Sequence, residues 1–240
     1  MTRLINMWSG PRNVSTAMMY SWAQRADTTV WDEPMYGHYL VVTGVDHPGR
    51  DEILTTVVTD ADEILNEMRF GACPTPVRFF KNMAHHLIGF DRAAVDHFDN
   101  FLLTRDPRDM LPSLATGLDR VPEIRDTGYE FQLEIVERDL ARGRAPVVVD
   151  SRLLLDAPEL VLRELCSRLD VAWDEAMLAW PPGPKPQDGV WAPHWYGRLH
   201  TTTGFEPYSP KTDPFPSELV PLYEQCRPMY ERLTKFAIEP

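Results

Sequence analysis

The sequence contains no apolar run long enough to cross a membrane as a helix. A membrane-spanning helix needs roughly twenty consecutive apolar residues, and no stretch of this chain approaches that length. The apolar residues before Ser9 form a segment too short for the core of a signal peptide. These two absences predict a cytoplasmic protein without a membrane partner.

Cysteine is also scarce. The three cysteines, Cys73, Cys166 and Cys226, cannot all pair with one another. Cys166 and Cys226 lie on apolar faces of predicted helices. Reduced thiols in a reducing compartment are the simplest interpretation, because stable disulfides belong to oxidising environments.

Basic residues are fewer than acidic ones. The 240 residues include 24 lysines and arginines against 36 aspartates and glutamates, which gives a net charge of −12. This balance argues against broad electrostatic binding to nucleic acid or to an anionic membrane. Any anion site must therefore be local, and Arg12, Arg105 and Arg108 are the arginines expected to supply its charge.

Several catalytic signatures are missing as well. The loop 9–16 reads SGPRNVST and lacks the Gly-Lys pair of the GxxxxGK[ST] pattern, which disfavours an ordinary nucleotide triphosphatase. The chain has no Gly-x-Ser-x-Gly elbow, so covalent hydrolysis by such a serine is not expected. Adjacent His85 and His86 would point to different faces of a helix and make a poor metal pair, and we expect no metal.

The patterns that are present predict an α/β fold. A length of 240 residues with 43% hydrophobic content suits a single globular domain over residues 1–240. Short apolar runs alternate with segments of helical periodicity, which predicts a three-layer fold resembling P-loop nucleotide triphosphatases, with a central parallel sheet flanked by helices. The predicted strands are 3–8, 28–32, 77–82, 99–104 and 146–150. The predicted helices are 15–25, 57–69, 107–117, 127–142, 157–169 and 217–236.

The segment 181–216 interrupts this pattern, because it is rich in proline, glycine, tryptophan and tyrosine. A loop of this length is often functional, which makes a lid over a site one interpretation. An irregular strap that buries Trp191, Trp195 and Tyr196 on the domain is the other. The sequence leaves both open.

The loop 9–16 has the features of an anion site. It follows the buried strand 3–8 and leads into the helix that begins at Ser15, and its Gly, Pro and Asn residues predict a turn with exposed backbone N–H groups. Those donors, the positive end of the helix and the hydroxyls of Ser15 and Thr16 would surround a tetrahedral anion. Arg12 adds a permanent charge.

A second loop follows the same plan. Arg105 follows the buried run 101–104, and Pro107 suits the first position of a helix. In an open α/β sheet the carboxyl edge of the strands is where ligands bind. Ser113 lies about two helical turns further on and could offer its hydroxyl to a second phosphate, although Pro112 should bend the helix just before it.

These segments resemble sulfotransferases that use 3′-phosphoadenylyl sulfate (PAPS) as donor. The family's first loop reads like Pro-Lys-Ser-Gly-Thr-Thr and corresponds to residues 11–16 here, and its second signature, Arg-(Asn/Asp)-Pro-(Lys/Arg)-Asp followed by Ser, corresponds to 105–109 and Ser113. The likeness extends from about residue 3 to 180 and includes the strand and helix of 147–166. The glycine-rich Arg-Lys-Gly segment of cytosolic members is absent.

The resemblance implies roles for individual residues. The first loop would hold the 5′-phosphosulfate and the second the 3′-phosphate, with adenosine 3′,5′-bisphosphate (PAP) as the spent product. Arg12 would take the place of the family's loop lysine and stabilise the leaving phosphate electrostatically, because its pKa is too high for proton donation. The residues expected to bind the donor are Arg12, Asn13, Val14, Ser15, Thr16, Arg105 and Ser113.

Glu33 is the first candidate for the base that deprotonates the acceptor. It ends the strand 28–32, and Pro34 is expected to hold it extended at the carboxyl edge of the sheet. His38 is the alternative base, because an imidazole titrates near neutral pH. Lys81, at the end of the strand 77–82, is a further candidate that could supply charge to the transferred sulfonate or pair with a carboxylate.

The expected function is sulfuryl transfer from PAPS to a hydroxyl or amine of a small molecule. The aromatic residues Trp31, Tyr36, Tyr39, Trp191, Trp195 and Tyr196 hint at an acceptor pocket, although large aromatics are usually core. A P-loop kinase is the rival class, with Asp150 at the end of a strand as a magnesium ligand. A protein that binds nucleotides without catalysing a reaction is a third hypothesis. A homo-oligomer is compatible with the sequence.

Overall fold

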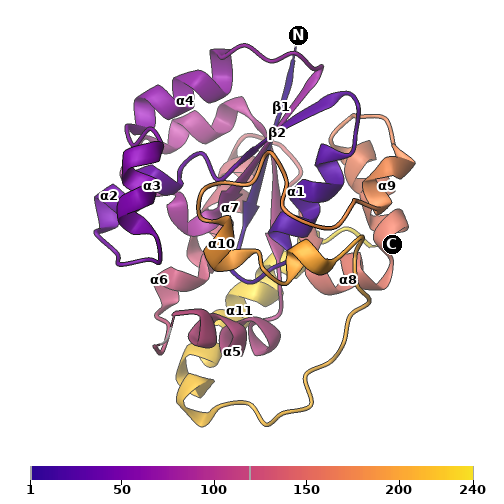
Figure 1. Ribbon diagram of the computed structural model, residues 1–240. Coiled ribbons are helices and arrows are strands. Elements are labelled where there is room, and N and C mark those ends of the chain that lie inside the picture. Colours follow the sequence, from indigo (N-terminus) through magenta and orange to yellow (C-terminus); the bar gives the residue numbers. More distant parts are fainter. Residues whose placement is uncertain (1, 119, 240) are drawn as a thin grey trace. The chain divides into compact units, whose positions relative to one another are not determined.

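The computed structural model describes residues 2–118 and 120–239. Within them, five strands form one parallel sheet in the order β2-β3-β1-β4-β5 (Figure 1). The strands are β1 (Arg3–Ser9), β2 (Thr28–Asp32), β3 (Val77–Met83), β4 (Asp99–Thr104) and β5 (Val148–Asp150). The predicted α/β class and parallel sheet are confirmed.

Helices connect these strands, and all six predicted helices are present with shifted ends. They are α1 (Ser15–Ala23), α4 (Ala61–Phe70), α5 (Pro107–Leu118), α7 (Tyr129–Ala141), α9 (Pro158–Arg168) and α11 (Val220–Leu233). The sequence analysis did not predict α2 (Tyr36–Thr43), α3 (Arg50–Thr56), α6 (Ile124–Thr127), α8 (Ser151–Asp156) and α10 (Ala192–Trp195). Short 3-10 helices are η1 (Ala84–His86), η2 (Arg92–His97), η3 (Glu175–Leu178), η4 (Leu199–Thr201), η5 (Ser217–Leu219) and η6 (Thr234–Phe236).

The shifted ends have local causes. Helix α4 begins at Ala61 rather than at residue 57, because the Asp60 side chain accepts a hydrogen bond from the backbone N–H of Glu63 at 2.9 Å and caps the helix there. Helix α7 follows Gly128, whose φ of 80° only glycine adopts easily. The starts of these two helices are thus decided by a local backbone or capping feature rather than by the apolar pattern.

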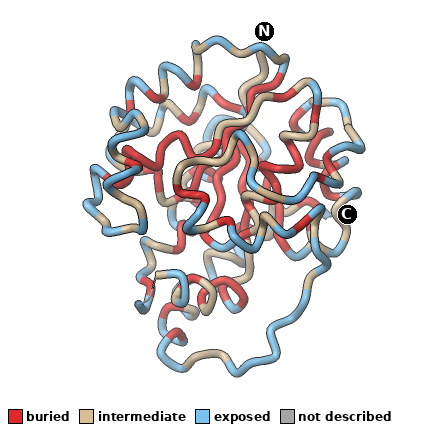
Figure 2. Tube along the Cα trace, viewed as in Figure 1, coloured by how far each residue is buried: buried red, intermediate tan, exposed pale blue. Residues whose placement is uncertain are grey.

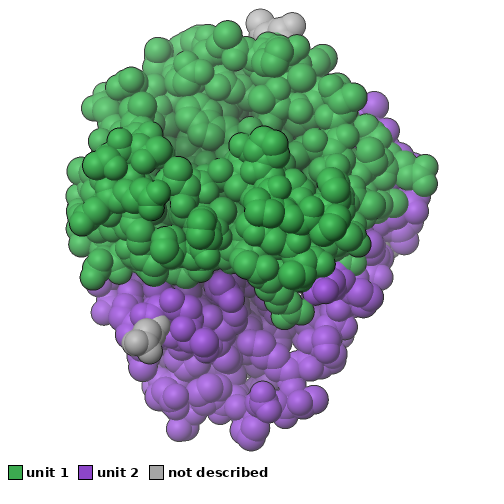
Figure 3. All heavy atoms as spheres, viewed as in Figure 1, with its two compact units in different colours: residues 1–7, 16–100, 174–205 green, residues 8–15, 101–173, 206–240 purple. Residues whose placement is uncertain are grey.

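The chain divides into two compact units (Figure 3). Unit 1 comprises residues 1–7, 16–100 and 174–205, and unit 2 comprises residues 8–15, 101–173 and 206–240. In unit 1, β2 pairs with β3 in a register that places Asp32 opposite Lys81. In unit 2, β4 pairs with β5, with Thr104 opposite Asp150. The single domain predicted from the sequence stays a prediction.

The core of unit 1 surrounds β3, which is buried at every position (Figure 2). A strand covered on both faces normally carries only apolar residues. Here Arg78, Lys81 and Asn82 are buried within it. Each must find a polar partner, because an unpaired buried charge is costly.

Residues 179–204 of unit 1 form a long loop that is closed at its base. Ala179 and Gly204 form an antiparallel bridge, and the backbone N–H of Trp180 donates to the Thr203 carbonyl at 3.0 Å. The loop contains α10 and η4. The irregular segment predicted at 181–216 therefore divides, with residues 206–216 belonging to unit 2.

In the described parts of the chain the three cysteines form no disulfide, with Cys166 and Cys226 buried in α9 and α11 and Cys73 half-buried. Among the described helices, none combines the length and apolarity that a membrane span requires.

Candidate active site

The loop between β1 and α1 holds a strained backbone in unit 2. Arg12 and Val14 have φ values of 53° and 48°, in the left-handed region, whereas Asn13 between them does not. Such a conformation is uncommon for any residue but glycine and is an outlier for a β-branched one. Alternation of this kind turns successive backbone N–H groups toward one side and forms a concave anion site.

The strained loop is held in place by polar contacts to β4. The Asn13 side-chain amide and the Gly10 backbone N–H both donate to the Leu103 carbonyl, the second at 3.2 Å. The Gln132 amide donates to the carbonyls of Leu103, at 2.9 Å, and Trp8, at 3.0 Å. Because several contacts fix the loop, it can keep a conformation that costs about 1–3 kcal/mol per residue.

The second predicted loop lies against the first. The Arg105 guanidinium donates to the Arg12 carbonyl at 2.8 Å, and the Arg105 carbonyl accepts from the Tyr129 hydroxyl at 2.5 Å. Arg12 Nε donates to Ser113 Oγ at 3.0 Å. Helix α5 continues through Pro112, so the proline does not interrupt the helix that carries Ser113. The structure thus brings Arg12, Arg105 and Ser113 together.

Arg12 and Arg105 have no carboxylate counterion within residues 2–118 and 120–239. Partial burial, and after it the neighbouring Arg105, lowers the pKa of Arg12. Partial burial also lowers the pKa of Lys211, to which Arg105 and Arg12 contribute while Asp109 opposes them. Among the residues that the structure describes, neither Arg12 nor Arg105 forms an ion pair. Like charges held together in this way favour a bound anion.

Lys211 was not singled out from the sequence. It lies in the segment 206–216, which is fixed on either side of it. The Tyr208 hydroxyl donates to Asp109 at 2.8 Å, and the Arg108 guanidinium lies 5.7 Å from the ring of Phe215. The sequence around Lys211 is proline-rich and gives no sign of an anion site. Lys211 comes near the arginines only through these tertiary contacts.

A recess beside the first loop carries polar atoms without partners. Asn13 Oδ1, Thr104 Oγ1 and Gln132 Oε1 are buried and have no hydrogen-bond partner among the described residues. The residues that line the recess include all three, together with Gly10, Pro11, Arg105, Met110, Thr127 and Tyr129. Buried polar atoms are normally paired, so these three atoms are exceptions, and the recess beside them has no room for a water molecule.

Ser15 and Thr16 are the first two residues of α1, with Ser15 buried. Their position at the N-terminus of the helix agrees with the expectation from the sequence. Their predicted contact with the donor stays a prediction.

Unit 1 holds the second cluster, centred on Lys81. The Lys81 ammonium donates to Asp32 Oδ1 at 3.0 Å, to Glu33 Oε1, and to the Tyr196 hydroxyl at 2.7 Å. Its side chain is 1% exposed. Because an ammonium has three hydrogens, all its donors are used. The predicted pairing of Lys81 with a carboxylate is found, and no donor remains for a sulfonate in this arrangement.

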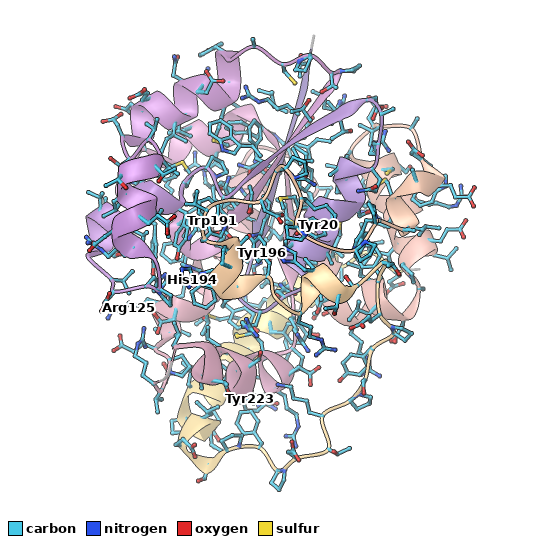
Figure 4. All side chains as sticks on the ribbon, viewed as in Figure 1. Tyr20, Arg125, Trp191, His194, Tyr196 and Tyr223 are labelled. Atoms are coloured by element: carbon cyan, nitrogen blue, oxygen red, sulfur yellow. The ribbon has the colours of Figure 1, made fainter. Side chains whose placement is uncertain are left out.

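Tyr196 comes from the 179–204 loop, as does Trp191 (Figure 4). The Tyr196 hydroxyl donates to Asp32 Oδ2 at 2.8 Å and accepts from Trp191 Nε1 at 3.0 Å. The backbone N–H of Gly189 also donates to Asp32 Oδ2, at 3.1 Å. The loop therefore completes the polar environment at the end of β2.

Glu33 is not extended, contrary to the expectation from Pro34. Its φ is 40°, in the left-handed region. Its backbone N–H donates to the Lys81 carbonyl at 2.7 Å, and its own carbonyl accepts from the Tyr36 N–H at 3.0 Å. The chain must turn sharply between the end of β2 and the start of α2, and these two bonds impose that turn.

The carboxyl group of Glu33 is buried and asymmetric. Its described hydrogen bonds reach Oε1, whereas Oε2 lies 4.0 Å from His86 Nε2. Burial raises the pKa of Glu33, Lys81 opposes the shift, and Asp32 adds to it. A carboxylate with a raised pKa and one oxygen without a partner among the described residues suits a general base.

The two histidines near Glu33 differ in their surroundings. His38 places Nδ1 3.1 Å from the Thr59 carbonyl and Nε2 2.9 Å from the Ile88 carbonyl, so both its nitrogens are engaged by backbone. His86 is buried against Tyr36 and Tyr39, and burial lowers its pKa well below the ordinary value. His86 is therefore neutral, and the geometry favours Glu33 over His38 as base.

The aromatic residues expected to line one acceptor pocket fall into two groups. Tyr36, Tyr39, Trp191 and Tyr196 belong to one buried cluster, with Trp195 packed against it. Trp31 packs instead against a different cluster that contains Met35 and Phe80. The shared pocket is thus wrong for Trp31, because its strand directs it to the other cluster.

Asp150, the magnesium ligand of the rival kinase reading, is occupied by protein contacts. It caps α8 by accepting from the backbone N–H groups of Arg152, at 2.8 Å, and Leu153, at 3.3 Å. Its second oxygen accepts from the Tyr230 hydroxyl at 2.7 Å. In the described parts of the chain no group of three His, Cys, Asp or Glu residues is arranged to hold a metal ion.

Comparison with known proteins identifies the family. Residues 2–234 match the sulfotransferase domain family, and the chain belongs to it. Solved structures with the same fold include a sulfotransferase domain from the curacin biosynthetic pathway, which is 13% identical with a TM-score of 0.58 and covers 95% of this chain and 98% of that chain. A sulfotransferase from Alicyclobacillus acidocaldarius is 13% identical with a TM-score of 0.55 and covers 98% and 95%.

Two curated relatives come from Arabidopsis thaliana. Branched-chain-amino-acid aminotransferase-like proteins 2 and 1 are 36% and 37% identical over 96% of this chain. The chain spans only 41% of the length of each relative.

Proposed function

We propose that this protein transfers a sulfuryl group from PAPS to a hydroxyl or amine of a small molecule. Membership of the sulfotransferase family and the fold support sulfuryl transfer, and the proposal adds the donor and the kind of acceptor. The observation that carries it is the group of Arg12, Arg105 and Lys211 around a left-handed loop with no carboxylate paired to the arginines.

The donor is a substrate with two anionic ends, and unit 2 offers two sets of donors. The backbone N–H groups of the loop 10–14 suit the 5′-phosphosulfate, because their concave arrangement and Arg12 match a tetrahedral anion. Arg105 and Ser113 suit the 3′-phosphate. Lys211 supplies a third cation from the segment 206–216, where the glycine-rich segment of cytosolic relatives is missing.

The chemistry would proceed as a direct displacement. The acceptor O–H or N–H gives its proton to Glu33 Oε2, a bond forms between the acceptor atom and sulfur, and the bond from sulfur to the phosphate oxygen breaks. The released phosphate carries the extra negative charge, which Arg12 and the loop N–H groups stabilise. The products are the sulfated acceptor and PAP.

The other two functions make different demands on the site. A kinase would need a carboxylate able to hold magnesium, and the contacts of Asp150 disfavour that role. A protein that binds the nucleotide without turnover would keep the arginines but would not need a base. A measurement of sulfuryl transfer therefore distinguishes a binding protein from the proposed enzyme.

Calorimetric titration with PAP tests the donor site. We expect micromolar binding of PAP, no comparable binding of ATP with magnesium, and loss of PAP binding in Arg105→Ala. Arg227→Ala is the control, because Arg227 is an exposed arginine of the same unit and pairs with Glu231 on α11. Preferential binding of magnesium and ATP would support the kinase, and equal binding by Arg105→Ala and wild type would exclude the assigned site.

Turnover is tested by release of PAP from PAPS. A panel of phenols, alcohols, sugars and amines would be screened as acceptors with the wild-type protein. A protein that binds PAP and transfers sulfate to none of them would support the non-catalytic reading.

A further inference from the structure

We infer that Tyr196 and Lys81 are positioning residues that hold the Glu33 carboxylate in place, with Tyr196 supplied by the 179–204 loop. The inference rests on the proposed role of Glu33 as base. It adds a role for the 179–204 loop, for which the sequence allowed two interpretations, a lid or a strap.

The Tyr196 hydroxyl has no spare bonding capacity. It accepts from Lys81 Nζ at 2.7 Å and from Trp191 Nε1 at 3.0 Å, and it donates to Asp32 Oδ2 at 2.8 Å. A hydroxyl has one donor and two acceptor sites, so all three are filled. Because every bond has a defined direction, the hydroxyl fixes the ammonium and the Asp32 carboxylate relative to one another.

Lys81 transmits this arrangement to Glu33. Its three hydrogens are shared among Asp32, Glu33 and Tyr196. The Tyr196 hydroxyl helps to hold the ammonium beside Glu33 Oε1, so loss of that hydroxyl would loosen the contact between Lys81 and Glu33. Lys81 itself stays charged, because its two carboxylate partners raise its pKa against the effect of burial.

The loop that carries Tyr196 is attached to unit 1 by a second polar link. The Tyr20 hydroxyl donates to Asp188 Oδ1 at 2.7 Å, and His200 Nε2 lies 3.0 Å from Asp188 Oδ2. Both tyrosines use one hydroxyl to bind a carboxylate, and only Tyr196 reaches Lys81. They form a matched pair for experiment.

The titratable groups that face Glu33 define the expected pH effect. They are Asp32 on β2, Lys81 on β3, Tyr36 on α2, His86 in η1 and Tyr196 at the end of α10. Burial raises the pKa of Glu33, the charge of Lys81 lowers it, and Asp32 adds to the increase. Removing the Tyr196 hydroxyl loosens the contact between Lys81 and Glu33 and should therefore move the pKa of Glu33 further upward.

The test compares Tyr196→Phe with Tyr20→Phe over a range of pH. A base must be deprotonated, so the acid limb of kcat/KM follows the pKa of Glu33. We expect Tyr196→Phe to move that limb up by about 0.5–1 pH unit, the equivalent of one hydrogen bond, and to recover activity at higher pH. Tyr20→Phe should keep the wild-type limb. Identical limbs in both variants would overturn the inference.

A measurement without turnover separates this inference from the proposed function. Carboxyl carbon NMR of protein labelled at glutamate would follow the titration of Glu33, assigned by the signal missing from Glu33→Gln. A Glu33 titration that moves upward in Tyr196→Phe and not in Tyr20→Phe supports the positioning of Glu33 by Tyr196. This conclusion would hold even if Glu33→Gln kept full activity. Full activity of Glu33→Gln would contradict only the proposed role of Glu33 as base. An unmoved titration in Tyr196→Phe overturns the positioning role.

Lys81 provides the second variant pair. Lys81→Met removes the cation and should raise the pKa of Glu33 more than Tyr196→Phe does, whereas Lys81→Arg retains a charge and should restore part of the shift. If Lys81→Met does not fold, Lys81→Arg still tests the point, because its titration should lie between those of wild type and Tyr196→Phe. A Lys81→Arg titration above that of Tyr196→Phe would contradict the role of the cation.

Discussion

The two candidate clusters hold their cations in different ways. In unit 2, Arg12 and Arg105 contact backbone and hydroxyl groups and have no ion pair among the described residues. In unit 1, Lys81 is enclosed by two carboxylates and a tyrosine hydroxyl and is 1% exposed. The first arrangement leaves positive charge for a ligand, whereas the second neutralises its charge within the protein.

The clusters share a strained backbone. Three of the four residues other than glycine with positive φ in the described chain are Arg12, Val14 and Glu33, and all three belong to the clusters. Such strain persists only where surrounding contacts impose it, and it is frequent at functional sites. The comparison suggests that strain in unit 2 shapes an anion site, while strain in unit 1 places the Glu33 carboxylate beside Lys81.

The largest effect is expected from removing the proposed base. Glu33→Gln should lower kcat by about 10²- to 10⁴-fold, the range for loss of general base catalysis, because the amide cannot accept the proton. Binding of PAP, which depends on unit 2, should stay unchanged. Glu63→Gln, an exposed change on α4, is the control in steady-state assays. A Glu33→Gln enzyme with wild-type kcat would contradict the proposed role of the unit 1 cluster in catalysis.

The next effect concerns stability and tests whether the charges in unit 1 are internally matched. Asp32→Asn removes one carboxylate from Lys81 and should cost about 3 kcal/mol, the low end for breaking a buried pair, because Glu33 remains as counterion. Asp156→Asn breaks an exposed pair with Arg152 and should cost less than about 1 kcal/mol. Urea unfolding of both variants measures the difference. Equal losses would show that burial adds nothing to the Lys81 cluster.

The fold was largely predictable because its strands are apolar runs and its long helices carry regular apolar spacing. Helix α2 was missed for a physical reason. It has eight residues, no side-chain cap, and β-branched Val41, Val42 and Thr43, which are weak helix formers. Burial of Tyr39 and Leu40 stabilises it instead. A helix that depends on packing leaves little local signal.

The candidate site was predictable where short segments carry it and unpredictable where distant residues meet. Arg12 and Arg105 lie in loops that follow strands, Ser113 lies in the helix after the second loop, and Glu33 directly follows another strand. Tyr196 follows Lys81 by 115 residues, and no periodicity links a tyrosine in an irregular loop to a lysine in a strand. The left-handed φ of Glu33 was unpredictable too, because the following proline favours an extended backbone.

A smaller effect is expected in unit 2 from the residue that the sequence did not reveal. Lys211→Ala should weaken PAP binding by about two- to fivefold, the range for an exposed ion pair, and should lower the salt dependence of binding. Calorimetry at two salt concentrations measures both. Lys235→Ala, an exposed lysine in η6 of the same unit, should leave both unchanged. If both variants lost the same small amount of PAP affinity, Lys211 would contribute only to the overall charge of the protein and not to the site.

The smallest effect tests the strain itself. Val14→Gly should raise the free energy of unfolding by about 1 kcal/mol, because glycine adopts a φ of 48° without the penalty of a β-branched side chain, although it adds entropy to the unfolded chain. PAP binding should persist, since the backbone N–H groups remain, and Val41→Gly in α2 should destabilise instead. A destabilised Val14→Gly would mean that the loop gains more from the valine side chain than it loses in backbone strain.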